Sequence, residues 1–152
     1  MRRIDMRTSS VIFLTCLIIL VLVTSINGSS DDWVEYQKSK NGDVFLYDKV
    51  SVQHTTQYIV QVWGKCVFSD KGREEYIRDR KNKGVSTEWS ERVTQVLYLY
   101  GIDCKKRRSQ IISITEYDMD GNILSSNSYD KPGWSSIPPD SRVDNLREEV
   151  CK

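Results

Sequence analysis

Cysteines are the residues of this chain best suited to covalent or metal chemistry. Four occur among its 152 residues, and three of them, Cys66, Cys104 and Cys151, follow the N-terminal apolar segment. The sequence has no CxxC pair, and its single histidine, His54, cannot complete a zinc-binding set with these thiols. Cysteines of exported proteins are usually oxidised to disulfides. We therefore expect one disulfide if the chain leaves the cytosol, and no metal site.

Residues suited to acid–base or nucleophilic catalysis are present, but nothing in the sequence pairs them. His54 lies in a polar segment that we expect to be a turn, and neither Ser51 nor Ser113 stands in a G-x-S-x-G motif. The adjacent glutamates at 74–75 and 148–149 would point in different directions on a helix. The sequence therefore predicts no catalytic residue and no enzyme.

The acidic segment around Asp118 could suggest a calcium loop. In an EF-hand, glycine follows the third ligand and a glutamate stands at the twelfth position. Here Gly121 precedes Asn122, and the glutamate is missing. We interpret residues 118–122 as a hairpin turn, and we predict no cofactor.

The first thirty residues have the layout of a targeting segment. Three arginines within residues 1–7 precede the apolar run Val11–Ile26, and small polar residues follow at 27–30. This order is typical of a secretory signal peptide, and a retained N-terminal membrane anchor is the alternative. We therefore predict a targeting segment at 1–30 and one exported domain at 31–152, in which only an uncleaved N-terminal segment would touch a membrane.

The exported part is nearly neutral. From Asp31 onward it holds 19 of the 22 basic residues and 20 of the 21 acidic ones, for a net charge of about −1. A protein that neutralises many phosphates needs a basic excess, so nucleic acid is excluded as a general partner. The basic run at 105–108 is interpreted as a solvated strand end.

Alternating apolar residues predict an antiparallel sheet. One hairpin is expected across Asn41-Gly42, because that pair favours the positive φ angles of a tight turn. Cys66 shares the apolar phase of its strand, and Cys104 shares the phase of the strand before it. About six strands are expected, in the regions 33–37, 44–52, 56–68, 92–103, 110–117 and from 123 onward.

The last residues predict a short helix. Ser141 is suited to cap its N-terminus, and Val143, Leu146 and Val150 fall on one stripe beside Cys151. Strand phase favours a bridge between Cys104 and Cys151, a separation of 47 residues whose closure is worth about 4 kcal/mol. Cys66 is then a free thiol, although its pairing with either of the other two remains an alternative.

The charged segment 69–89 is expected to be an exposed excursion from the sheet. Its charge density and its glycines favour a loop, with one helical turn at 74–77. Trp89, at its end, is the best candidate for an exposed aromatic contact. We therefore predict partner contacts at Trp89, Arg78, Arg80 and Lys81.

Several short segments stand in a recognisable order along residues 31–152. They are Trp33, Asn41-Gly42 through Tyr47-Asp48, Val62-Trp63, Tyr100 to Cys104, Asp118 to Gly121, Trp134 to Ile137, Pro138 to Ser141 and Val150-Cys151. In this order and spacing the chain resembles the surface-adhesin protein E family of Gram-negative bacteria. The resemblance implies an α+β fold: a bent antiparallel sheet of about six strands, with a C-terminal helix held on its concave face by the Cys104–Cys151 disulfide.

The resemblance also carries expectations about function. It implies an exported, non-enzymatic envelope domain in the periplasm or on the outer cell surface. Its expected partner is a host extracellular-matrix protein or another envelope component, and a homodimer is compatible with it. The alternative is a periplasmic structural or stress-related protein with no host ligand.

Overall fold

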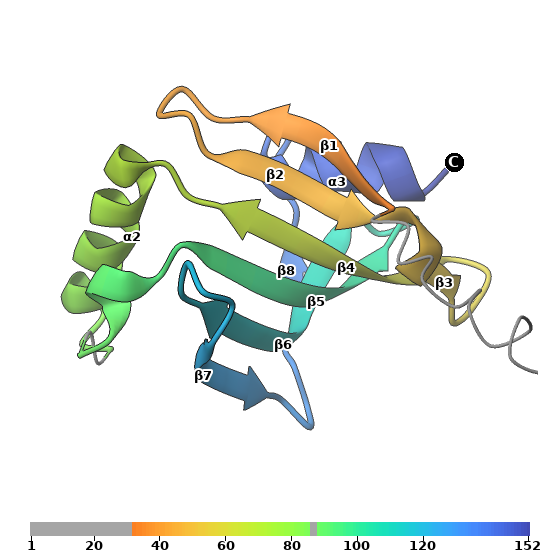
Figure 1. Cartoon of the computed structure of the whole chain (residues 1–152). Helices are drawn as coiled ribbons and strands as arrows, with labels where there is room; N and C mark the ends of the chain where they lie inside the picture. The colour runs from red at the N-terminus through yellow and green to blue at the C-terminus, as the bar shows by residue number, and fades with distance from the viewer. Residues whose placement is uncertain (1–31, 86–87) are drawn as a thin grey trace, which may run out of the picture. The chain divides into compact units, whose positions relative to one another are not determined.

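The computed structural model describes residues 32–85 and 88–152, and its main feature is one antiparallel sheet (Figure 1). The strands follow the order β1-β2-β4-β5-β6-β7, with β3 paired to β4 and β8 paired to β6. The expected sheet is thus confirmed, with six main strands and two short additions. Their bounds are β1 (Trp33–Lys38), β2 (Val44–Asp48), β3 (Gln53–His54), β4 (Ile59–Val67), β5 (Gln95–Asp103), β6 (Arg108–Tyr117), β7 (Ile123–Ser128) and β8 (Ser135–Ser136).

The centre of the sheet is the long pair β4–β5, in register from Ile59↔Asp103 to Val67↔Gln95. Alternation along these strands buries one face, as the sequence predicts. The buried side chains that the two strands contribute to the core are Val60, Val62, Cys66, Val96, Tyr98, Tyr100 and Ile102. Register shifts interrupt the β1–β2, β5–β6 and β6–β7 ladders. Such bulges bend and twist a sheet, which accounts for its curvature.

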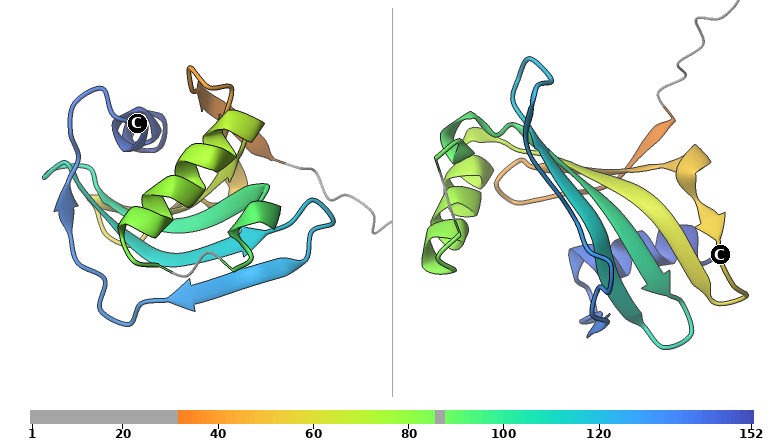
Figure 2. Two further views of the ribbon diagram at one scale, coloured as in Figure 1. Left: turned by 90° about the vertical axis from the view of Figure 1, so that its left-hand side faces the viewer. Right: turned by 90° about the horizontal axis from the view of Figure 1, so that it is seen from below.

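The C-terminal helix α3 (Arg142–Val150) lies on the inner side of the curved sheet (Figure 2). Leu146 and Val150 are buried in the core, and Val143 packs against it, so the predicted stripe is confirmed. The Ser141 hydroxyl accepts a hydrogen bond from the Asp144 backbone N–H at 3.2 Å, which caps the helix.

A disulfide joins the end of β5 to the end of α3. It links Cys104 and Cys151, whose Cα atoms are 5.7 Å apart. The pairing favoured by strand phase is therefore present in the structure. Cys66 is a buried free thiol on β4.

The charged excursion is a helix and not a loop, so this prediction was wrong. The helix α2 (Asp70–Asn82) begins after Ser69, whose hydroxyl accepts from the Gly72 backbone N–H at 3.0 Å. Gly72 is one of the glycines that favour a loop in the sequence, but in the structure it allows close packing against Asp43. A Cβ atom there would lie 1.8 Å from a carboxylate oxygen of Asp43. That carboxylate also accepts from the Ser69 N–H and hydroxyl, both at 2.9 Å, and so joins the β1–β2 turn to the start of α2.

Smaller differences concern turns. Gly42 has the expected positive φ of 97°, but the β1–β2 connection spans residues 39–43 and closes with a hydrogen bond from Ser39 N–H to Asp43 C=O at 2.9 Å. His54 lies in the short strand β3, opposite Val60, and not in a turn. Two 3₁₀ turns, Lys49–Ser51 and Ser90–Arg92, complete the secondary structure. Among the described residues, no helix is long and apolar enough to cross a membrane.

Candidate binding surfaces

The helix α2 is attached to the sheet through a buried carboxylate on β6. Glu116 is only 1% exposed, and three side chains donate hydrogen bonds to it. The donors are the Tyr76 hydroxyl, Arg80 Nη1 at 2.5 Å and Trp89 Nε1 at 3.3 Å. A buried carboxylate is tolerated only when donors and a countercharge replace the water that it has lost. This cluster therefore fixes α2 and the segment before β5 to the same point of the sheet.

The cluster changes the assignment of two predicted contact residues. Trp89 packs against the core and is half-buried, so the expectation of an exposed aromatic residue was wrong. Its indole N–H donates a hydrogen bond to the Glu116 carboxylate, so the ring lies against the protein and not in solvent. Arg80 also points inward, with its side chain 15% exposed. The structure brings Trp89 and Arg80 together at Glu116, which sequence reasoning did not single out.

The other two predicted contact residues lie on the solvent side of α2. Arg78 is 69% exposed in its side chain and lies 3.9 Å from Glu75. Lys81 is exposed and, within residues 32–85 and 88–152, has no ion pair. Both border a shallow hollow with Glu74, Ile77 and Asn82. We call Glu74, Ile77, Arg78 and Lys81 the outer face of α2.

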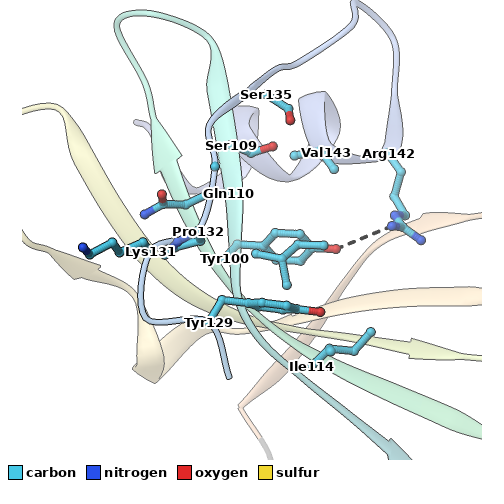
Figure 3. Close-up of a pocket in the computed structure, with 12 residues that line it drawn as sticks. Tyr100, Ser109, Gln110, Ile114, Tyr129, Lys131, Pro132, Ser135, Arg142 and Val143 are labelled. Atoms are coloured by element: carbon cyan, nitrogen blue, oxygen red, sulfur yellow. Dashed lines mark hydrogen bonds between the residues drawn. The ribbon is translucent and has the colours of Figure 1, made fainter. Parts of the chain in front are cut away.

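A second surface feature is a pocket on the inner side of the sheet. Its volume is about 420 Å³, and it lies between β5, β6, the segment 129–133 and the start of α3 (Figure 3). Pockets of this size commonly hold small ligands. The lining residues are Tyr100, Ser109, Gln110, Ile111, Ile114, Tyr129, Lys131, Pro132, Gly133, Ser135, Arg142 and Val143. We call it the inner pocket.

Arg142, the first residue of α3, reaches into an aromatic environment beside the inner pocket. Its guanidinium carbon lies 4.9 Å from the centre of the Phe45 ring and 5.7 Å from that of Tyr98. One Nη atom donates a long hydrogen bond of 3.5 Å to the Tyr100 hydroxyl (Figure 3). Aromatic faces attract a guanidinium through their quadrupoles, so these rings hold the group in place without neutralising it.

No ionised group of the described residues compensates Arg142. Burial raises the pKa of Tyr98 and of Tyr100, so both phenols are neutral at physiological pH. Asp144, the nearest acid along the helix, binds Arg147 Nε at 2.7 Å and Arg107 Nη2 at 2.8 Å. The only sequence signal for Arg142 was its position after the capping serine, and that position does not reveal a missing countercharge.

Metal binding finds no support in the described part of the chain. It contains no group of three or more histidine, cysteine, aspartate or glutamate residues that could hold an ion. At the acidic turn, the Asp118 carboxylate accepts from the backbone N–H groups of Asp120 at 3.0 Å and Asn122 at 2.8 Å. These bonds close the β6–β7 hairpin, as predicted.

The sequence profile of the family described as surface-adhesin protein E matches residues 33–152. No curated protein sequence was found to match. Crystal form II of Haemophilus influenzae protein E is similar in structure, with a TM-score of 0.51 and 14% identity over 84% of this chain and 91% of that chain. This likeness supports the fold.

Two further structures of the same protein were also found. One structure of Haemophilus influenzae protein E has a TM-score of 0.48 and 16% identity, over 84% of this chain and 87% of that one. Its selenomethionine form has a TM-score of 0.49 and 13% identity, over 84% and 89%.

Proposed function

The chain belongs to the surface-adhesin protein E family, and from this premise we propose that it is an exported, non-enzymatic domain that binds another macromolecule. We place it in the periplasm or on the outer cell surface, where its partner is a host extracellular-matrix protein or another envelope component. The N-terminal segment that would direct export lies outside the described residues.

The observation that carries this proposal is the attachment of α2. Three donors on α2 and the following segment converge on the buried Glu116, so the helix is held at the end of the sheet. Its outer face remains open to solvent, and Arg78 and Lys81 are exposed there. A surface with its backbone already ordered loses less conformational entropy when it binds, which favours affinity.

The charge of this face indicates the chemistry of the partner. Two nearby cations are paired with acids of α2, Arg73 with Asp70 at 2.9 Å and Lys83 with Asp79 at 2.7 Å. Lys81 is not so paired within the described chain, and Arg78 is only loosely paired. We therefore expect an acidic segment of the partner to contact these two cations, with Ile77 beside them as the apolar contact.

The experiment reverses the charge of the outer face. The full chain is expressed with its own N-terminal segment, and binding of the exported product to immobilised extracellular-matrix proteins is compared with that of Arg78→Glu/Lys81→Glu. The matched control, Lys49→Glu/Lys106→Glu, makes the same charge change at the opposite end of the sheet, where both lysines are exposed. We expect loss of binding only for the α2 variant, and we expect binding of the wild type to weaken as the salt concentration rises.

Location is tested separately by digesting intact cells with a protease. Loss of the protein from intact cells supports display at the surface. If the protease removes the protein only from lysed cells, binding to a host protein is contradicted, and the proposed partner is then an envelope component in the periplasm. Equal binding by the α2 variant and the wild type would contradict the role of the outer face.

A further inference from the structure

The inner pocket carries positive charge without an acid to balance it. Its twelve lining residues include Lys131 and Arg142, and none is an aspartate or glutamate. Two other largely buried arginines of the described chain form ion pairs with acids, Arg80 with Glu116 and Arg147 with Asp144. Among residues 32–85 and 88–152, the contacts of the Arg142 guanidinium are the long bond to the Tyr100 hydroxyl and the two aromatic faces. A half-buried cation of this kind has unused hydrogen-bonding capacity, because a guanidinium has five N–H donors.

The rest of the pocket combines aromatic and aliphatic side chains with the polar Ser109, Gln110 and Ser135, and it is only partly covered. Tyr129 remains 50% exposed and Ile111 38% exposed, although both line the pocket. Figure 3 shows the Tyr100 hydroxyl facing the Arg142 guanidinium, with the Tyr129 ring and the Ile114 side chain below the Tyr100 ring. Apolar side chains left open to water beside an uncompensated cation fit one ligand chemistry, namely an anion attached to an apolar group.

We infer that the inner pocket binds a carboxylate carried on an apolar body, with Arg142 as its anchor. The guanidinium is planar, and its paired N–H groups match the two oxygens of a carboxylate. Phe45 and Tyr98 already fix its position, so binding would not have to order this side chain. The apolar body would lie against Tyr129 and Ile114, and Lys131 would stand at the rim.

Two sources could supply this chemistry: a free organic acid, or the C-terminal residue of a peptide chain. Both present a carboxylate next to an apolar group, and the pocket distinguishes them only by the room that it leaves for further residues. The inference is independent of the proposed function, because the pocket is formed by β5, β6 and α3 and does not include α2.

The experiment uses 3-phenylpropionate as the free acid and 3-phenylpropanamide as its neutral analogue. Each is titrated into the exported product of the full chain, and amide chemical shifts are followed by NMR. We expect saturable binding of the acid in the millimolar range or tighter, with shifts at Tyr129, Ile114 and Val143, and no saturable binding of the amide. N-acetylphenylalanine and a peptide ending in free phenylalanine then identify the source. Tighter binding of the peptide indicates a chain terminus, and equal or weaker binding indicates a small acid.

Variants distinguish a specific role of Arg142 in binding from a general effect of the protein's charge. Arg142→Gln should weaken binding of 3-phenylpropionate by about ten- to a hundredfold, because it removes charge-assisted hydrogen bonds. Arg142→Lys should also weaken it, since a lysine keeps the charge but loses the fork. Lys106→Gln removes a charge from an exposed lysine that lines neither candidate surface, and this control should bind 3-phenylpropionate as the wild type does. If Arg142→Gln does not fold, Tyr129→Ala removes an exposed wall and should weaken binding severalfold with the fold intact.

Three results would overturn the inference. The acid could fail to saturate, the acid and the amide could bind equally, or Arg142→Gln could retain the wild-type affinity. The last result would leave Arg142 as a purely structural side chain stacked on Phe45 and Tyr98.

Discussion

Removing the disulfide with Cys104→Ala/Cys151→Ala should cost a large part of the folding free energy. The bond closes a separation of 47 residues, and in the chain-entropy model its loss destabilises the native state by about 4 kcal/mol. Domains of this size are typically stable by about 5–15 kcal/mol. Burial of Leu146 and Val150, worth about 2 kcal/mol each, remains in the variant. We therefore expect a folded but much less stable protein whose helix α3 opens first.

Urea unfolding followed by tyrosine and tryptophan fluorescence measures this loss. With a slope of about 2 kcal/mol per molar urea, the midpoint should fall by about 2 M. The slope itself should rise, because the unfolded chain without the bridge exposes more surface. Wild-type protein in reductant should show the same midpoint as the variant. A change of less than about 0.5 M, corresponding to roughly 1 kcal/mol, would refute the argument that the bond holds α3 against the sheet.

Three other perturbations follow from the buried groups. Arg80→Met leaves the Glu116 carboxylate without its countercharge and should lower the free energy of unfolding by about 3 kcal/mol, whereas Arg78→Met should change it little; urea midpoints measure both. A hydrogen bond from Arg147 holds the pKa of Asp144 below its usual range. The stability that the ionised Asp144 contributes is therefore present above about pH 4 and is lost as the pH falls through the lowered pKa. Between pH 7 and pH 3, the melting temperature of Asp144→Asn should fall less than that of the wild type. Burial raises the pKa of the Cys66 thiol to about 12, so mass mapping should find it alkylated by iodoacetamide at pH 8 only after denaturation.

The strands and the C-terminal helix were predictable because their signals are local. Val60, Val62 and Cys66 share one phase of β4 while Gln61 and Lys65 share the other, and a period of two also separates the buried side chains from Val96 to Ile102. A half-buried strand needs only this pattern. The helix α3 has both a capping serine and an apolar stripe, and the strand phase of Cys104 placed its tether on the correct face.

The helix α2 was missed because it buries so little apolar surface. Its inward contacts are made by Tyr76, which packs on Phe68 with ring centres 4.8 Å apart, and by the charged Arg80. A helix is recognised in a sequence by an apolar stripe, and a charged segment such as this one has none. Ser69 as an N-cap was the local signal for a helix. Gly72 argued against a helix, because the sequence does not show that a glycine is needed there for contact with Asp43.

Neither candidate surface could be fully predicted from the sequence. Glu116 lies 27 residues from Trp89 and 40 from Tyr76, and nothing local shows that these side chains meet. The preference of the inner pocket for an anion follows from the lack of an acidic partner for Arg142 among the described residues. An absent countercharge is a property of the folded chain, and only a structure displays it.

The burial of Cys66 protects the pairing of the other two cysteines. A thiol exchanges with a disulfide only when its thiolate reaches one of the two sulfur atoms. Cys66 is buried on β4, where it lies opposite Val96 in the β4–β5 ladder and not opposite Cys104. Exchange with the Cys104–Cys151 bond would therefore require these central strands to separate, so the native pairing persists for as long as the sheet stays closed.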